Sequence, residues 1–151
     1  MNLKNYCSKA VEPDKRYVAA VKETKINPES NIFRKEMIVM LSMEALKEYG
    51  VKTNEGLARC CNMEAFYFKM ITASVNDANF AKLGKALEAH DLQEAFEAAH
   101  ALKGIAGNLA LDPLYDAVCE IVEPLRARED KDYTEQYKKV MEARDKLAAI
   151  I

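Results

Sequence analysis

The scarcity of helix-breaking residues is the feature that most limits how this chain can fold. Only 5 glycines and 4 prolines occur in 151 residues, and the stretches between them are rich in Ala, Leu, Glu, Lys and Met. These five residue types favour helices, and no stretch alternates between apolar and polar residues as a half-buried strand would. The sequence therefore predicts an all-α protein.

Helix start and stop signals divide the chain into an N-terminal extension and a main domain. Residues 1–30 form the extension, in which 14–25 is a candidate short helix, and residues 31–151 form the domain. Within the domain we expect helices at about 31–49, 55–61, 63–75, 80–89, 91–110, 112–128 and from 132 to the C-terminus. Connections of two to five residues between them favour antiparallel neighbours in a bundle.

Three polar residues are expected to begin helices. Asn62 is a suitable N-cap for the helix that follows it. Asp91 with Glu94, and Asp132 with Glu135, have the spacing of a capping box, which places carboxylates at the positive end of a helix.

Charge and hydropathy exclude several classes of function. The chain has 22 Lys and Arg against 24 Asp and Glu, a net charge of -2, so no positive excess is available to bind nucleic acid. No apolar run is long enough to span a membrane, and the first residues lack the apolar stretch of a signal peptide. We therefore expect a cytoplasmic protein that binds no membrane and works as a monomer.

The cysteines and one of the two histidines suggest no metal site. Cys7, Cys60, Cys61 and Cys119 fit no zinc-ligand spacing, and we expect them to be small buried hydrophobic residues. His90 precedes a helix start and lacks a ligand partner at helical spacing, so we expect it in a solvated turn.

The other histidine, His100, lies where burial cannot explain it. On a helix at about 100° per residue, an apolar stripe lies opposite the imidazole. It consists of Ala95, Ala98, Leu102, Ile105, Ala106 and Leu109. Within about 60° of His100 lie Gln93, Phe96, Glu97, Lys103, Gly104 and Gly107.

Two neighbours of His100 break the usual rules for a helix. A glycine in a helix interior costs about 1 kcal/mol relative to alanine, yet Gly104 and Gly107 both occur on the predicted solvent side. We interpret both as clearance that lets another molecule approach the imidazole. Lys103 favours the neutral ring and stabilises an anion attached to it, and Phe96 offers an apolar contact at the rim.

This pattern predicts a surface histidine that accepts an anionic group during a protein–protein encounter. A phosphoryl group is the first candidate, because its transfer needs positioning and charge neutralisation more than an elaborate pocket. The simpler alternative is an exposed histidine without a function on an amphipathic helix.

The segment 99–109, AHALKGIAGNL, closely resembles the signature of histidine-containing phosphotransfer (HPt) domains. That signature reads AH-x-LKG, followed by a small residue, Gly, and Asn before a hydrophobic residue. Residues 51–69 resemble the stretch that introduces the first bundle helix in many bacterial members, and 114–126 resemble the helix after the histidine helix. The resemblance covers roughly residues 36–151.

The resemblance implies an antiparallel four-helix bundle that relays phosphoryl groups in two-component signalling. The group passes between receiver-domain aspartates, or comes from a histidine kinase system. The chain would be a phosphocarrier rather than an enzyme, without a cofactor or metal of its own, and the receiver would supply Mg²⁺.

The resemblance also assigns roles to residues of this chain. His100 would be the phosphoacceptor, through Nε2, and Lys103 would contact the phosphoryl oxygens. The other residues would form the surface on which the partner docks: Gln93, Phe96, Glu97, Gly104, Gly107 and Asn108.

Two departures and one rival function remain. Ala110 stands where many members have Gly, at the expected end of the histidine helix. Some members orient the histidine with a polar residue of the next helix, and here Cys119, Val122 and Glu123 are the candidates. The rival is a phosphorylation-independent adaptor that binds receiver domains or other signalling proteins through the same face.

Overall fold

The computed structural model describes residues 42–151, and the structural statements below concern these residues. The expected extension 1–30 and the start of the helix expected from residue 31 lie outside the described residues. Residues 42–49 are helical, and six further helices follow: α3 (Thr53–Arg59), α4 (Glu64–Val75), α5 (Asn79–Glu88), α6 (Leu92–Asn108), α7 (Asp112–Arg126) and α8 (Thr134–Ala148). The described part contains no strand, so the predicted all-α class is confirmed.

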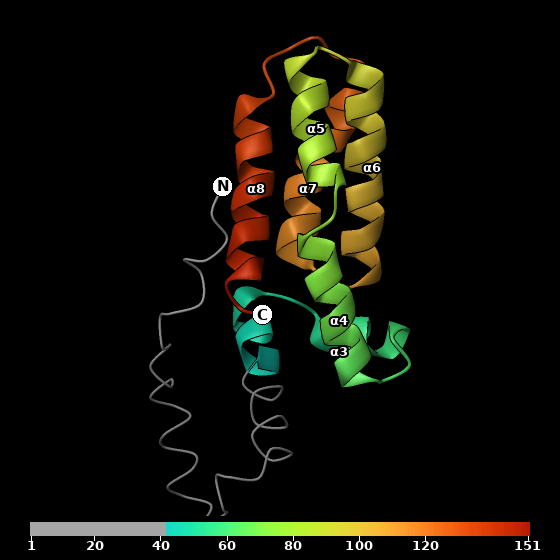
Figure 1. Ribbon diagram of the computed structural model, residues 1–151, viewed down its shortest axis with the longest axis vertical. Coiled ribbons are helices and arrows are strands. Elements are labelled where there is room, and N and C mark those ends of the chain that lie inside the picture. The colour runs from blue at the N-terminus through green and yellow to red at the C-terminus, as the bar shows by residue number, and fades with distance from the viewer. Residues whose placement is uncertain (1–41) are drawn as a thin grey trace, which may run out of the picture. The chain divides into compact units, whose positions relative to one another are not determined.

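The last four helices form an antiparallel up-and-down bundle (Figure 1). α5 packs on α6, α6 on α7, and α7 on α8, while α4 also contacts α8. The expected break after Val75 is present, because residues 76–78 separate α4 from α5. None of the described helices has the length and apolar character needed to cross a membrane.

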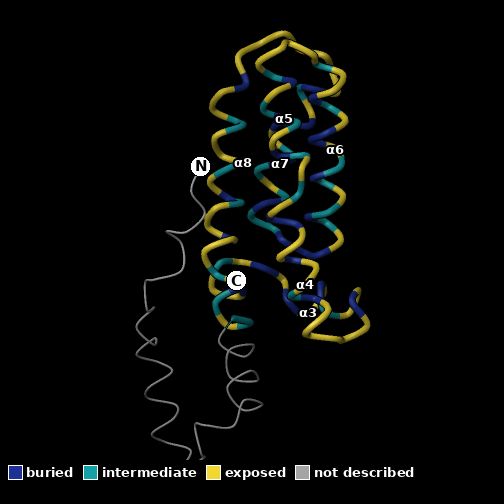
Figure 2. Tube along the Cα trace, viewed as in Figure 1, coloured by how far each residue is buried: buried dark blue, intermediate teal, exposed yellow. Residues whose placement is uncertain are grey.

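The core explains why α6 can lie close to its neighbours. Its buried residues are mostly alanines, and small side chains let helix axes approach. They are Ala95, Ala98, Ala99, Leu102 and Ala106. In Figure 2 the inner side of each bundle helix is buried and the outer side is exposed. The predicted apolar stripe is thus confirmed except for Ile105, which is only half-buried because it lies beside a surface hollow.

The start of α6 follows the prediction in part. Asp91 Oδ1 accepts a hydrogen bond from the Glu94 backbone N–H at 2.9 Å, as an N-cap does. The Glu94 carboxylate forms an ion pair with Lys82 of α5 at 3.5 Å. One half of the expected capping box is therefore present, and the Glu94 side chain also links α6 to α5.

Two other expected helix starts are wrong. The N-cap of α4 is Met63, while Asn62 lies in the left-handed region with φ 56°, which asparagine tolerates better than most residues. Asp132 accepts hydrogen bonds from the Thr134 N–H and hydroxyl, at 2.9 and 2.6 Å, and not from Glu135. Both polar residues therefore shape turns rather than cap helices.

Residues that precede α5 form hydrogen bonds with the chain just after the C-terminal end of α6. α6 ends at Asn108, and Ala110 follows with φ 55°, the left-handed conformation that glycine adopts more easily. The Ala110 carbonyl accepts a hydrogen bond from the Lys52 N–H at 3.1 Å. The Tyr67 hydroxyl donates to the Leu109 carbonyl at 2.8 Å, and burial raises the pKa of Tyr67 to about 12.

The expectation that the cysteines are buried holds for one and fails for another. Cys60 is buried in the core, Cys119 is half-buried, and Cys7 lies outside the described residues. Cys61 is exposed because it lies in the left-handed turn after α3, with φ 56°.

Candidate functional site

His100 lies near the middle of the outer face of α6 and is exposed, as predicted. Its ring stacks on Phe96, one helical turn earlier, with the ring centroids 5.5 Å apart and the planes at 28°. Within residues 42–151 the imidazole makes no hydrogen bond or ion pair. The imidazole is therefore oriented by an aromatic contact, and its nitrogens are available to an incoming group.

The two glycines of this face differ in their surroundings. A Cβ at Gly104 would meet no atom within 4 Å, which is the clearance that the sequence predicts. A Cβ at Gly107 would lie 3.3 Å from Tyr115 Cε2 and 3.5 Å from Tyr115 Cδ2. The expectation that both glycines face open solvent is therefore wrong for Gly107, because the first turn of α7 places an aromatic ring against it.

The Lys103 side chain forms an ion pair with Glu123 of α7. Its ammonium lies 3.2 Å from Glu123 Oε1 and 5.9 Å from the centroid of the Tyr115 ring, and 22% of the side chain is exposed. The ammonium donates a hydrogen bond to the Glu123 carboxylate, and this bond is the main cause that raises the pKa of Lys103. Lys103 is therefore a charged donor near His100, but in this structure its ammonium is bonded to the Glu123 carboxylate.

None of the three α7 residues that were candidates to orient His100 bonds to its imidazole. Val122 is completely buried in the core, Cys119 is half-buried, and Glu123 bonds to Lys103. In the part of the chain that the structure describes, none of the three donates to or accepts from the imidazole. Phe96, which was expected only at the rim, is the residue that contacts the ring.

Polar side chains form a network at the N-terminal end of the same face. Gln93 Nε2 donates to Glu97 Oε1 at 2.8 Å, and both residues are exposed. The Arg128 guanidinium, from the loop between α7 and α8, donates to Gln93 Oε1. Sequence reasoning missed Arg128, because its position depends on a loop in which it takes a left-handed conformation, with φ 54°.

The C-terminal end of the face is bordered by α3 and α4. The Arg59 guanidinium of α3 donates to the Gly107 carbonyl, where a cation complements the negative end of the helix. Asn108 is exposed and lines a hollow of about 190 Å³ together with Met70 and Ile105. Arg59 was also missed, since no local signal links α3 to the end of α6.

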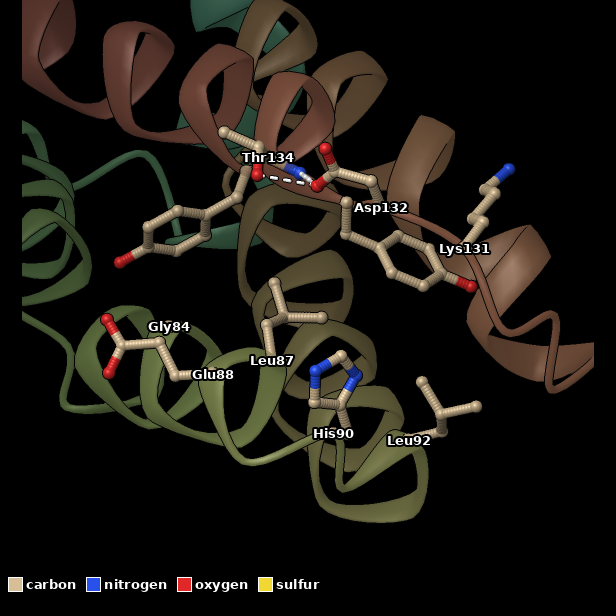
Figure 3. A pocket seen from close by; sticks show the side chains of 10 residues that line it. Gly84, Leu87, Glu88, His90, Leu92, Lys131, Asp132 and Thr134 are labelled. Atoms are coloured by element: carbon tan, nitrogen blue, oxygen red, sulfur yellow. Dashed lines mark hydrogen bonds between the residues drawn. The ribbon is translucent and has the colours of Figure 1, made fainter.

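His90 has a different environment from His100 (Figure 3). It lies in the turn between α5 and α6 with φ 56°, exposed as predicted, and lines a cleft of about 370 Å³ beside Leu87 and Leu92. On one side of this cleft, a dashed line marks the hydrogen bond between Thr134 and Asp132, which are two residues apart in the chain. No group of three or more His, Cys, Asp or Glu residues within 42–151 is placed to hold a metal ion.

The fold and the site together define a class of protein: an antiparallel helical bundle that presents one accessible histidine, beside a lysine and an open glycine, on the outer face of a helix. Comparison with protein families agrees. A family model described as the Hpt domain matches residues 75–149, which include α5 to α8 and His100. This part of the chain belongs to the Hpt domain family, whose members carry phosphoryl groups on histidine in two-component signalling.

The family match is shorter than the resemblance noted in the sequence. It begins at residue 75, so α3 and most of α4 lie outside it, including the segment 51–69. Searches of curated proteins and of solved structures found no match to the chain.

Proposed function

We propose that this protein is a phosphocarrier that takes a phosphoryl group onto His100 and passes it to a receiver domain. The donor is a receiver-domain phosphoaspartate or a histidine kinase system. The observation that carries the proposal is the exposed imidazole, stacked on Phe96 and bonded to no other described residue, beside the open position of Gly104.

The chemistry needs little from the carrier itself. The neutral imidazole, with its proton on Nδ1, attacks the phosphorus of an aspartyl phosphate through the Nε2 lone pair. The N–P bond forms as the P–O bond to the aspartate breaks, and the carboxylate leaves with the electron pair of that bond. Passing the group to a second aspartate reverses these bond changes, so the protein is a carrier rather than an enzyme.

Each neighbour of His100 has a role in this proposal. Lys103 contacts the phosphoryl oxygens and offsets their charge, since three ammonium protons can serve more than one acceptor. Phe96 fixes the plane of the ring, and Gly104 leaves room for the partner. The remaining docking contacts come from the ends of the face, at Gln93, Glu97 and Asn108.

The partner completes the site. A receiver domain holds Mg²⁺ beside its phosphoaspartate, so the proposal requires no metal on this chain. The partners are cytoplasmic receiver domains and kinases, and the carrier acts as a monomer through the single histidine face of α6.

The test is phosphoryl transfer from a panel of phosphorylated receiver domains to the full chain and to His100→Gln. We expect the variant to lose all labelling while its circular dichroism spectrum and melting temperature stay unchanged, because His100 is exposed. His90→Gln is the matched control and should be labelled like the native protein. Labelling of His100→Gln would refute the proposal. Full signalling by an unlabelled variant in cells would instead support the phosphorylation-independent adaptor.

A further inference from the structure

Glu123 lies close to the proposed phosphoryl site without touching the histidine. We propose that Glu123 is a positioning residue: it holds the Lys103 ammonium in the unphosphorylated protein and competes with the phosphoryl group for it. This inference rests on the proposed function, because it concerns the same transfer to His100. It goes further by assigning to one α7 carboxylate the control of how strongly His100 retains the group.

The carboxylate of Glu123 has a cation on each oxygen. Oε1 accepts a hydrogen bond from Lys103 Nζ at 3.2 Å, and Oε2 lies 3.3 Å from Arg126 Nη1, one turn further along α7. If the ammonium moves toward a phosphoryl group, Arg126 still neutralises the carboxylate. Glu123 can therefore release Lys103 without becoming an isolated charge.

The path of the Lys103 side chain is restricted on the same side. Its ammonium lies over the Tyr115 ring, and that ring packs against Gly107 of the lysine's own helix. A lysine held between an aromatic ring and a carboxylate has few positions, so it loses less side-chain entropy when it binds an anion than a free lysine would. Tyr115 and Glu123 together keep the ammonium near the histidine face.

Charge decides the direction of the effect. A phosphoryl group on nitrogen carries more negative charge than a carboxylate, so it competes well for the ammonium. The Glu123 carboxylate opposes it in two ways: it shares Lys103, and it repels the added negative charge. Removal of this carboxylate should therefore strengthen the hold of His100 on the phosphoryl group.

The experiment compares Glu123→Gln with Glu120→Gln in the full chain. Glu120 is the matched control, because it lies on the same helix, is equally exposed and forms an ion pair with Lys139 of α8 at 2.7 Å. The measured quantity is the equilibrium constant for phosphoryl exchange between His100 and a receiver domain that labels it. We expect Glu123→Gln to raise the phosphorylated fraction of the carrier, with the constant shifting about two- to fivefold, as for one exposed ion pair.

A second pair of variants separates positioning from a merely structural role. In a Lys103→Met background the Glu123→Gln substitution should lose most of its effect, because the contested ammonium is absent. In parallel, NMR titration of Lys103 should show a lower pKa in Glu123→Gln than in the native protein, since the Glu123 hydrogen bond raises it. This titration tests the ion pair without any phosphoryl donor.

The outcomes distinguish the two proposals. A native chain that is never labelled at His100 overturns the proposed function, and this inference falls with it. A native chain that is labelled, with an exchange constant unchanged or lowered by Glu123→Gln, overturns the inference alone. An equal shift in Glu120→Gln, or a full shift in the Lys103→Met background, also overturns it.

Discussion

Gly104 and Gly107 lie about one turn apart on the outer side of α6, and the sequence alone treats them as equivalent. The structure separates them: Gly104 has open space where a side chain would begin, whereas Gly107 lies against the Tyr115 ring of α7. The open position follows the histidine by one turn. The covered position supports the ring over which Lys103 lies.

The difference shows that one sequence pattern serves two purposes. In the proposed function Gly104 leaves room for a second molecule, so the cost of glycine in a helix is offset only when a partner binds. Gly107 leaves room for a side chain of the same molecule, and its cost is offset within the folded chain by packing. The proposed docking face is therefore centred on His100 and Gly104, and its open space does not extend to Gly107.

The largest expected effect comes from filling the open position. Gly104→Glu should keep the helix, because glutamate favours helices more than glycine does, yet it places bulk and negative charge where the partner approaches. We expect the rate of phosphoryl transfer from a receiver domain to fall by about tenfold or more. The measurement is the initial rate of labelling at a fixed receiver concentration.

The control for this variant is Ala81→Glu, which adds the same charge at an exposed position of α5. It should transfer like the native protein. Equal rates for Gly104→Glu and the control would show that the space at Gly104 is not a docking position, and the contrast between the two glycines would lose its functional meaning.

A smaller effect on function but a clear one on stability is expected at Gly56 of α3. A Cβ there would lie 2.4 Å from the Tyr67 hydroxyl oxygen and 2.5 Å from the Leu109 carbonyl oxygen, and the latter is backbone. Gly56→Ala should lower the free energy of unfolding by about 1–3 kcal/mol, as overpacking does. Urea denaturation of the variant and the native protein measures this change in the free energy of unfolding.

Tyr67→Phe in combination with Gly56→Ala sharpens this test. The phenylalanine removes the hydroxyl but leaves the Leu109 carbonyl in place, so the double variant should recover little of the lost stability. A Gly56→Ala variant as stable as the native protein would show that α3 does not pack closely on the end of α6.

The smallest effects compare alanine at the two α6 glycines. Gly104→Ala should raise the free energy of unfolding by about 1 kcal/mol, since alanine favours helices and nothing obstructs its methyl group. Gly107→Ala should stay within about 0.5 kcal/mol of the native value, because contact with Tyr115 offsets the same gain. Equal gains at both positions would mean that the Tyr115 ring moves aside without cost.

The sequence allows the fold and the exposed position of His100 to be predicted, but not the contacts around His100. Helix periodicity is a local property, so the helices and the exposed position of His100 follow from the spacing of apolar residues. The Ala-rich inner face of α6 and the break after Val75 also follow from local patterns.

The remaining features depend on contacts between different helices and loops. Tyr115 reaches Gly107, Glu123 reaches Lys103, and Arg128 reaches Gln93 only after the helices pack. The prediction that Asn62 caps α4 is wrong for a different reason. Asparagine suits both an N-cap and a left-handed turn, and the local sequence does not distinguish the two.

The central claim is that His100 itself carries the phosphoryl group, and the most direct measurement locates that group on the labelled protein. After transfer from a phosphorylated receiver domain, mass spectrometry of peptides kept at alkaline pH identifies the modified residue. We predict a phosphoryl group on His100 that is lost on brief exposure to acid, as an N–P bond requires. A phosphoryl group on His90, or one bound to oxygen and stable to acid, would contradict the account.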